Sequence, residues 1–268
     1  MNRPVEAQAA TLSGAEAVVE MLAAHGVEVI FGLCGDTSLP LYDALARVGS
    51  LRHVLTRDER HAAYMADGYA RVTGRVGVCE GPSGGGATYI LPGLAEANES
   101  SIPVLAINTD VSVASRGKFT LTELDQRALM RPLTKWNAVL DRAADIPRTL
   151  RQAFEAMTTG RPGAAHLALP FDVQNAAVDR SEVWADPTLG RFPSRRVGPD
   201  PFFVELAAKL LRRAKHPVFI CGGGVVLSGA EGELLDLVEK LGAPVASTIS
   251  GKGSIDERHP LAVGVVGS

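Results

Sequence analysis

Short, continuous apolar runs alternate along this chain with longer segments in which apolar residues recur at helical spacing. The first helix is predicted to begin after Ser13, because Ser13 and Glu16 have the spacing of a capping box. Val18 and Leu22 lie on its apolar face, and Gly26 is a typical helix end. The same alternation of helix, turn and buried strand then continues along the chain.

The alternation predicts the class of fold. Strands are predicted over residues 27–33, 52–55, 76–79, 103–108 and 165–169, and helices over 39–48, 58–72, 87–97, 123–129 and 146–158. Short strands separated by helices are typical of a parallel sheet with helices on both faces. We therefore predict an α/β fold with a doubly wound parallel sheet, in which ligands bind at the carboxyl ends of the strands.

The chain is predicted to contain two domains, residues 1–173 and 200–268. The segment 174–199 is polar, contains Pro187, Pro193 and Pro199, and lacks periodicity, so we interpret it as a linker. A second α/β unit follows, with helices over 202–214 and 229–241 and strands over 217–221 and 244–248. About 70 residues is less than a typical α/β domain, so we expect this second domain to be truncated or split.

Composition narrows the function classes. The net charge of −3 provides no basic surface for nucleic acid or an anionic membrane. No secretory signal and no apolar run of membrane-spanning length is visible, and Cys34, Cys79 and Cys221 lack metal-ligand spacing. The six histidines form no i, i+4 pair, so no metal site is predicted. We expect a cytoplasmic protein that binds neither nucleic acid nor membrane.

Two glycine-rich turns each follow a predicted strand and open a predicted helix. Gly81-Pro82-Ser83-Gly84-Gly85-Gly86 lacks the Gly-Lys-Ser/Thr ending of a P-loop and the full G-x-G-x-x-G fingerprint of a dinucleotide-binding turn. Gly222-Gly223-Gly224 also lacks the full dinucleotide-binding fingerprint. Each turn is consistent with a phosphate cradle or with a tight turn in a packed α/β unit.

Glu59 is the acid with the strongest positional signal. It stands where the predicted strand 52–55 gives way to a small-residue helix, at the sheet edge where ligands bind. Acids are also favoured at helix N-termini by the helix dipole, which would make Glu59 a structural residue. Asp58, its neighbour, competes for any catalytic role.

At this point several ordered motifs resemble one family, the acetolactate synthase-like thiamine diphosphate (ThDP) enzymes, which include benzoylformate decarboxylases and other 2-keto acid carboligases. The resemblance runs from Leu12 to Ser268. Its motifs are Phe31-Gly32-Leu33-Cys34-Gly35, Arg57-Asp58-Glu59-Arg60, Met65-Ala66-Asp67-Gly68-Tyr69-Ala70-Arg71, Gly81-Pro82, Ser101-Ile102-Pro103-Val104, Arg131-Pro132, Gly160-Arg161-Pro162-Gly163, Pro217 to Gly224 and Gly251-Lys252-Gly253.

The resemblance implies a pyrimidine-binding (PYR) domain followed by the first part of a middle domain. It implies that Glu59 is the catalytic glutamate, which drives the cofactor's aminopyrimidine toward the form that removes the thiazolium proton. It also implies that four residues lie on the pyrimidine side of ThDP: Gly35, Pro82, Gly85 and Gly86. FAD is a further implied cofactor, with Arg161, Gly222, Gly223, Gly224 and Lys252 at the matching positions.

Departures from the family pattern point to a partner. Leu121-Thr122-Glu123 stands where acetolactate synthases carry Phe-Gln-Glu, and no Gly-Asp-Gly motif for Mg²⁺ and diphosphate occurs in the chain. The leading hypothesis is a split enzyme for a small 2-keto acid, completed by a subunit with the missing half and by a PYR-domain dimer partner. The alternatives are a non-catalytic assembly or regulatory module and a nucleotide-binding Rossmann protein.

Overall fold

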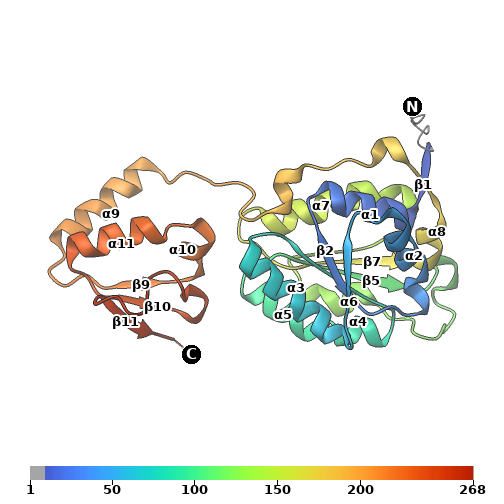
Figure 1. The fold of residues 1–268 in the computed structure, drawn as a ribbon, viewed down its shortest axis with the longest axis horizontal. Helices are drawn as coiled ribbons and strands as arrows, with labels where there is room; N and C mark the ends of the chain where they lie inside the picture. Colours follow the sequence, from blue (N-terminus) through green and yellow to red (C-terminus); the bar gives the residue numbers. More distant parts are fainter. Residues whose placement is uncertain (1–9, 268) are drawn as a thin grey trace, which may run out of the picture. The chain divides into compact units, whose positions relative to one another are not determined.

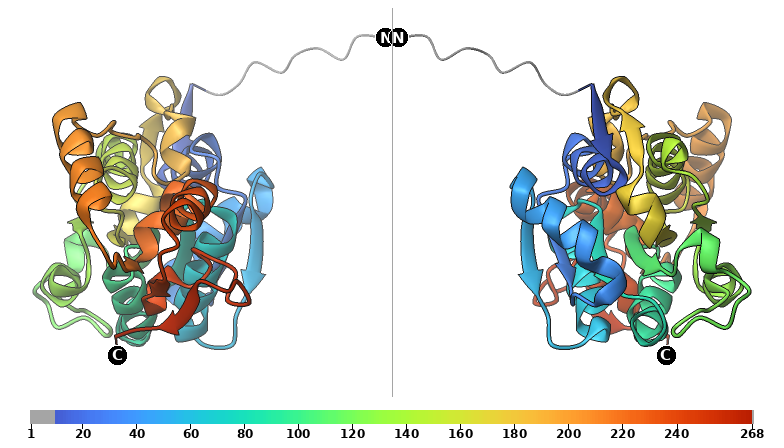
Figure 2. Two further views of the ribbon diagram at one scale, coloured as in Figure 1. Left: turned by 90° about the vertical axis from the view of Figure 1, so that its left-hand side faces the viewer. Right: turned by 90° about the vertical axis from the view of Figure 1, so that its right-hand side faces the viewer.

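The computed structural model describes residues 10–267, and these divide after Arg195 into two compact units. The first unit is built on a six-stranded sheet with the order β3-β2-β4-β5-β7-β6, in which all neighbouring strands are parallel. Helices α1 and α7 lie on one face of this sheet and α3 and α5 on the other (Figure 1 and Figure 2). This arrangement confirms the predicted α/β class.

The strands and helices of the first unit agree closely with the predicted positions. The main strands are β2 (Val29–Gly32), β3 (Arg52–Leu55), β4 (Gly77–Gly81), β5 (Val104–Asp110), β6 (Trp136–Val139) and β7 (Ala165–Pro170). The helices are α1 (Gly14–Ala24), α2 (Leu39–Val48), α3 (Glu59–Thr73), α4 (Gly85–Tyr89), α5 (Leu91–Glu99), α6 (Gln126–Met130), α7 (Ile146–Thr158) and α8 (Phe171–Asn175). Strand β6 was not predicted, and the single helix expected over 87–97 is divided into α4 and α5.

The strand order reverses between β2 and β4. From β2 the chain crosses to β3 on one side, and from β3 it returns to β4 on the other side of β2. The carboxyl ends of β2 and β4 therefore flank the topological switch point, where open parallel sheets hold their ligands. The segments that follow these two strands carry the four residues predicted to lie on the pyrimidine side of ThDP.

The core lies mainly between the sheet and the layer of α1 and α7. Met21 and Leu22 of α1 are completely buried, as are Leu150 and Phe154 of α7. The Ser13 hydroxyl accepts a hydrogen bond from the Glu16 backbone N–H, and the Glu16 carboxylate accepts one from the Ser13 backbone N–H, so the predicted capping box is present.

Gly77 of β4 is needed because α3 packs directly against it. A Cβ placed on Gly77 would lie 2.1 Å from the Ala66 carbonyl oxygen, whereas one placed on Gly68 of the same helix meets nothing within 4 Å. We expect Gly77→Ala to lower the free energy of unfolding by about 1–3 kcal/mol through overpacking. Gly68→Ala, the matched control, should raise it by up to about 1 kcal/mol through helix propensity. Urea denaturation measures both changes, and equal losses would contradict this account.

The segment 174–199, predicted to be a linker, differs from that expectation in the structure. Gln174 is completely buried, and Leu189 and Phe192 are also buried. Strand β8 (Ala177–Asp179) pairs antiparallel with β1 (Thr11–Ser13). Most of the segment packs on the first unit because its few apolar side chains and its short strand find partners there, although its sequence has no periodicity.

The second unit has a three-stranded parallel sheet with the order β11-β10-β9. Its elements are α9 (Pro201–Arg213), β9 (Phe219–Cys221), α10 (Gly223–Ser228), α11 (Glu231–Leu241), β10 (Val245–Ser247) and β11 (Ala262–Val265). None of the residues of α9 is buried, and Phe202, Phe203 and Leu210 expose most of their surface. Within residues 10–267, no helix is long and apolar enough to cross a membrane.

Candidate active site at the sheet switch point

Glu59 is the first residue of α3 and lies at the carboxyl end of the sheet, as the sequence predicts. Only 8% of its surface is exposed, yet within the described residues its carboxylate makes no hydrogen bond or ion pair. A buried carboxylate is costly unless it is paired or hydrogen-bonded. Glu59 therefore has capacity to bind a ligand group.

Asp58 is already engaged in the helix cap. Its Oδ1 accepts a hydrogen bond from the Arg60 backbone N–H at 2.8 Å, and its carboxylate accepts two more from the Arg60 guanidinium. These hydrogen bonds hold the pKa of Asp58 well below its ordinary value. Of the two neighbouring acids, Asp58 acts as the N-cap and Glu59 is the one left without a partner.

Three of the predicted cofactor residues pack together. A Cβ on Gly35 would lie 2.5 Å from the Cβ of Pro82, and a Cβ on Gly86 would lie 2.5 Å from the Cδ of Pro82. The two glycines therefore allow the Pro82 ring to lie between the loop after β2 and the start of α4. This packing explains the glycines structurally, and their contact with a cofactor stays a prediction.

The turn after β4 also approaches Glu59. A Cβ on Gly81 would lie 3.4 Å from Glu59 Cγ, which is ordinary contact, and 3.1 Å from Asn108 Nδ2, which is tight, so glycine eases the close approach of the strand end to these two side chains. The Asn108 Nδ2 donates to the Gly81 carbonyl, while its Oδ1 is buried and has no partner. Gly85, by contrast, has only Tyr89 within 4 Å of its Cβ position, so the space beside it is open.

A pocket of about 710 Å³ opens beside this turn. Gly35 and Pro82 line it, together with Thr37, Ser83 and the loop residue Thr122. Glu59 does not line the pocket itself, but Gly81, against which it packs, is adjacent to Pro82. The structure thus brings Gly35, Pro82 and Gly86 together, with Glu59 behind the same turn.

Sequence reasoning missed a second acid, Glu80 of β4. It is completely buried, its Oε1 accepts a hydrogen bond from Ser38 Oγ at 2.5 Å, and its Oε2 accepts one from Tyr42 OH at 2.8 Å. Burial raises the pKa of Glu80 to about 7. The signal was available, because Glu80 is a charged residue between Cys79 and Gly81 at the end of an apolar strand.

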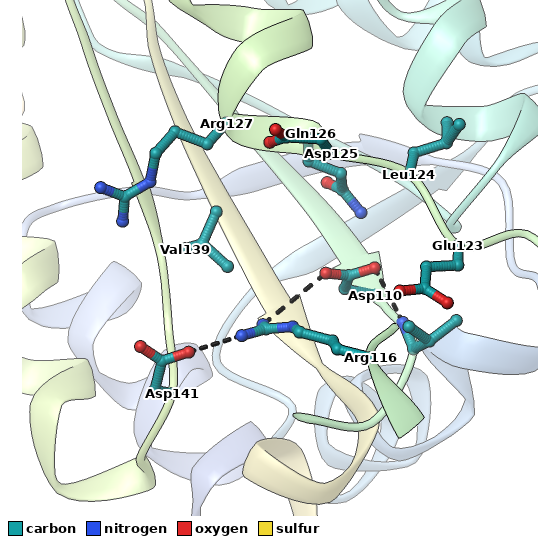
Figure 3. A pocket seen from close by; sticks show the side chains of 10 residues that line it. Asp110, Arg116, Glu123, Leu124, Asp125, Gln126, Arg127, Val139 and Asp141 are labelled. Atoms are coloured by element: carbon teal, nitrogen blue, oxygen red, sulfur yellow. Dashed lines mark hydrogen bonds and ion pairs between the residues drawn. The ribbon is translucent and has the colours of Figure 1, made fainter. Parts of the chain in front are cut away.

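A second pocket, of about 430 Å³, lies at the carboxyl end of β5 and is lined mostly by charged side chains (Figure 3). Arg116 lies between two acids there: its Nη1 is 2.5 Å from Asp141 Oδ1 and its Nη2 is 3.8 Å from Asp110 Oδ2. Burial raises the pKa of Asp110. These groups largely satisfy one another, and within residues 10–267 no cluster of three or more His, Cys, Asp or Glu side chains is arranged to hold a metal.

Arg161 and Lys252, two of the five residues predicted for FAD, already have side-chain partners. The Arg161 guanidinium donates to Ser101 Oγ at 2.8 Å and to the Glu99 carbonyl, and Lys252 Nζ lies 2.5 Å from Glu257 Oε1. Gly223 packs against the Ser250 carbonyl, with its Cβ position 3.0 Å from that oxygen. Arg161 belongs to the first unit and the other four to the second.

Comparison with known families decides the relationship. Residues 12–129 match the model of the N-terminal TPP binding domain of thiamine pyrophosphate enzymes, and residues 204–268 match the model of their central domain. The chain belongs to the thiamine pyrophosphate enzymes. Thiamine pyrophosphate is the same cofactor as ThDP, so the family resemblance seen in the motifs is confirmed.

Similar thiamine pyrophosphate enzymes include several acetolactate synthases. The probable acetolactate synthase large subunit of Methanocaldococcus jannaschii is 44% identical over 258 residues, which are 96% of this chain and 43% of that protein. The acetolactate synthase large subunit of Corynebacterium glutamicum is 40% identical, and the match covers 96% of this chain and 41% of that protein. The acetolactate synthase isozyme 3 large subunit of Escherichia coli is 37% identical, and the match covers 96% of this chain and 45% of that protein. The chain therefore spans less than half the length of these relatives.

Proposed function

We propose that this chain supplies the pyrimidine-binding part of the active site of a ThDP-dependent 2-keto acid decarboxylase or carboligase, with Glu59 as the catalytic acid. The observation that carries this proposal is the Glu59 carboxylate, which is buried at the switch point and has no partner among the described residues. The similarity to acetolactate synthases supports the reaction class.

The residues at the switch point fit the aminopyrimidine of ThDP. Glu59 would hold a proton at its carboxyl oxygen and share it with a ring nitrogen, and the unpartnered Asn108 Oδ1 provides a buried acceptor nearby. The open space beside Gly85 leaves room for a planar ring next to the turn after β4. When bound, ThDP supplies a carbon nucleophile for the carbonyl of a 2-keto acid.

We assign Mg²⁺ and the diphosphate to residues that are not in this chain, because its 268 residues contain no Gly-Asp-Gly motif. Those residues belong to further sequence of the same polypeptide or to a complementary subunit. We expect the assembled enzyme to be built on a pair of PYR domains. The exposed apolar side chains of α9 support a partner surface on the second unit. The unpaired cysteines are consistent with the predicted cytoplasmic location.

FAD has weaker support. Arg161 is already hydrogen-bonded to Ser101, and Lys252 is already ion-paired with Glu257. The absorption spectrum of the native complex tests this cofactor directly, and a colourless complex would remove it.

The native complex tests the proposed function. The chain is tagged, isolated with its partners from its own cells, and assayed for release of CO₂ from 2-keto acids with added ThDP and Mg²⁺. We expect turnover that depends on both additions, and calorimetry should show that the 268-residue chain alone binds ThDP much more weakly than the complex. A complex that neither binds ThDP nor turns over would favour the non-catalytic assembly module.

A further inference from the structure

A chain of hydroxyl groups connects the buried Glu80 carboxyl to the wall of the 710 Å³ pocket. Beyond Ser38, each neighbouring pair of oxygens in the chain is within hydrogen-bond distance: 3.0 Å, 2.8 Å, 3.2 Å and 2.7 Å in turn. The members of this hydroxyl chain are, in order, Ser38, Thr109, Thr37, Ser83 and Thr122. Its last three members line the pocket.

The fold makes specific room for the acid. A Cβ on Gly32 of β2 would lie 2.9 Å from Glu80 Oε2 and 2.7 Å from Tyr42 OH, so a larger residue would displace the hydrogen-bonded pair. Tyr42 donates to Oε2, which leaves Oε1 facing Ser38 at the start of the hydroxyl chain. Both carboxyl oxygens therefore have defined and different partners.

Burial and the nearby Glu59 raise the pKa of Glu80 and favour its protonated form, whereas the hydrogen bonds from Ser38 and Tyr42 lower the pKa and favour the carboxylate. Tyr42 of α2, Cys34 after β2 and Cys79 beside it are neutral, and Glu59 of α3 adds a negative charge. His53 of β3 packs edge-on against Tyr42, and burial lowers its pKa, which keeps it neutral. Among the described residues, Glu80 takes part in no ion pair.

We propose that Glu80 is a proton-holding residue of the pocket and exchanges its proton with bound substrate through the hydroxyl chain. While Glu80 is protonated, Oε1 carries the hydrogen and donates it to Ser38 Oγ, and once Glu80 is a carboxylate Ser38 Oγ donates to Oε1. In the transfer, the Glu80 O–H bond breaks and Ser38 Oγ receives the proton, while each hydroxyl passes its own proton to the next oxygen. Thr122 or Ser83 delivers a proton to the substrate carbon, a C–H bond forms, and Glu80 is left as a carboxylate that Tyr42 stabilises. After product release, the same hydroxyls transfer a proton in the opposite direction, from solvent in the pocket to the Glu80 carboxylate.

Only the identity of the reaction rests on the proposed function. A 2-keto acid that loses CO₂ needs a proton at the carbon that kept the electron pair. Glu80 is a buried acid that the hydroxyl chain connects to the pocket by hydrogen bonds. Glu59 packs against Gly81 and, among the described residues, makes no hydrogen bond to the hydroxyl chain, so the two acids have separate routes.

The first test needs no enzymatic activity. Infrared spectroscopy follows the carboxylic C=O stretch of the full chain after a pH jump from about pH 9 to about pH 6, on either side of the Glu80 pKa of about 7. We expect a carboxylic band that is present in the wild type and absent in Glu80→Gln. In Thr109→Val this band should rise at least about tenfold more slowly, because the variant lacks one hydroxyl of the proton relay. The matched control is Thr149→Val, since Thr149 is a buried threonine of α7 outside the chain.

The second test uses the native complex. Substrate protonation should slow as pH rises through about 7 in the wild type, and Glu80→Gln should abolish that pH dependence. A wild-type band that is absent, or that rises equally fast in Thr109→Val, would overturn the relay. Unchanged pH profiles in Glu80→Gln would also overturn it, whereas a complex without any turnover would count against the proposed function and leave the infrared result to decide the relay.

Discussion

Replacing Glu59 with glutamine is expected to reduce turnover of the assembled enzyme by a factor of roughly 10² to 10⁴, the usual contribution of a positioned acid or base. The amide has nearly the same size and keeps the first turn of α3 filled, but it cannot give up or receive the proton that the carboxyl exchanges. The Glu59 side chain has no hydrogen bond within the described residues, so the substitution breaks no existing contact. Circular dichroism should therefore show an unchanged fold.

The neighbouring acid provides the matched control. Asp58→Asn changes the same functional group one residue away, and asparagine caps helices about as well as aspartate. We expect this variant to keep most of the activity. Steady-state rates of both variants at saturating ThDP decide the matter, because a Glu59→Gln enzyme as active as Asp58→Asn would disprove the catalytic role of Glu59.

The periodic parts of the fold were predictable from the sequence. Ser13 and Glu16 located α1, and Gly26, Gly49 and Gly74 follow the ends of their helices with positive φ, as glycine allows. Such signals are local: they depend on hydrogen bonds and apolar contacts between residues that are close in the sequence. The same local reasoning placed Glu59 at a helix start beside the sheet edge.

Long-range pairing explains what the sequence did not reveal. Strand β8 exists because Ala177–Asp179 pairs with the distant Thr11–Ser13. Neither short segment has a periodicity that would predict this pairing. Gln174 similarly joins sequence-distant parts, since its Nε2 donates to the carbonyls of Thr37 and Leu169. Glu80 was passed over for the same reason: its partners Ser38 and Tyr42 lie about 40 positions away in the sequence, in the turn before α2 and in α2 itself.

Glu80 is also expected to make stability depend on pH in a measurable way. Burial raises its pKa from 4.5 to about 7, so the folded chain binds this proton more tightly than the unfolded chain. The resulting stabilisation is complete below about pH 4.5 and is lost as pH rises through about 7. At 1.36 kcal/mol per pKa unit, the loss amounts to roughly 3 kcal/mol.

Glu80→Gln removes this titration while keeping a side chain of similar volume that can still pair with Tyr42 or Ser38. The free energy of unfolding of the variant relative to the wild type should therefore rise by roughly 3 kcal/mol between about pH 4.5 and about pH 8 and then level off. Glu155→Gln on the exposed side of α7 is the control, and its difference from the wild type should stay nearly constant. Urea denaturation at several pH values measures these differences. Parallel curves for Glu80→Gln and the wild type would mean that Glu80 is ionised in the folded protein at neutral pH, and such a carboxylate would have no proton to give to the pocket.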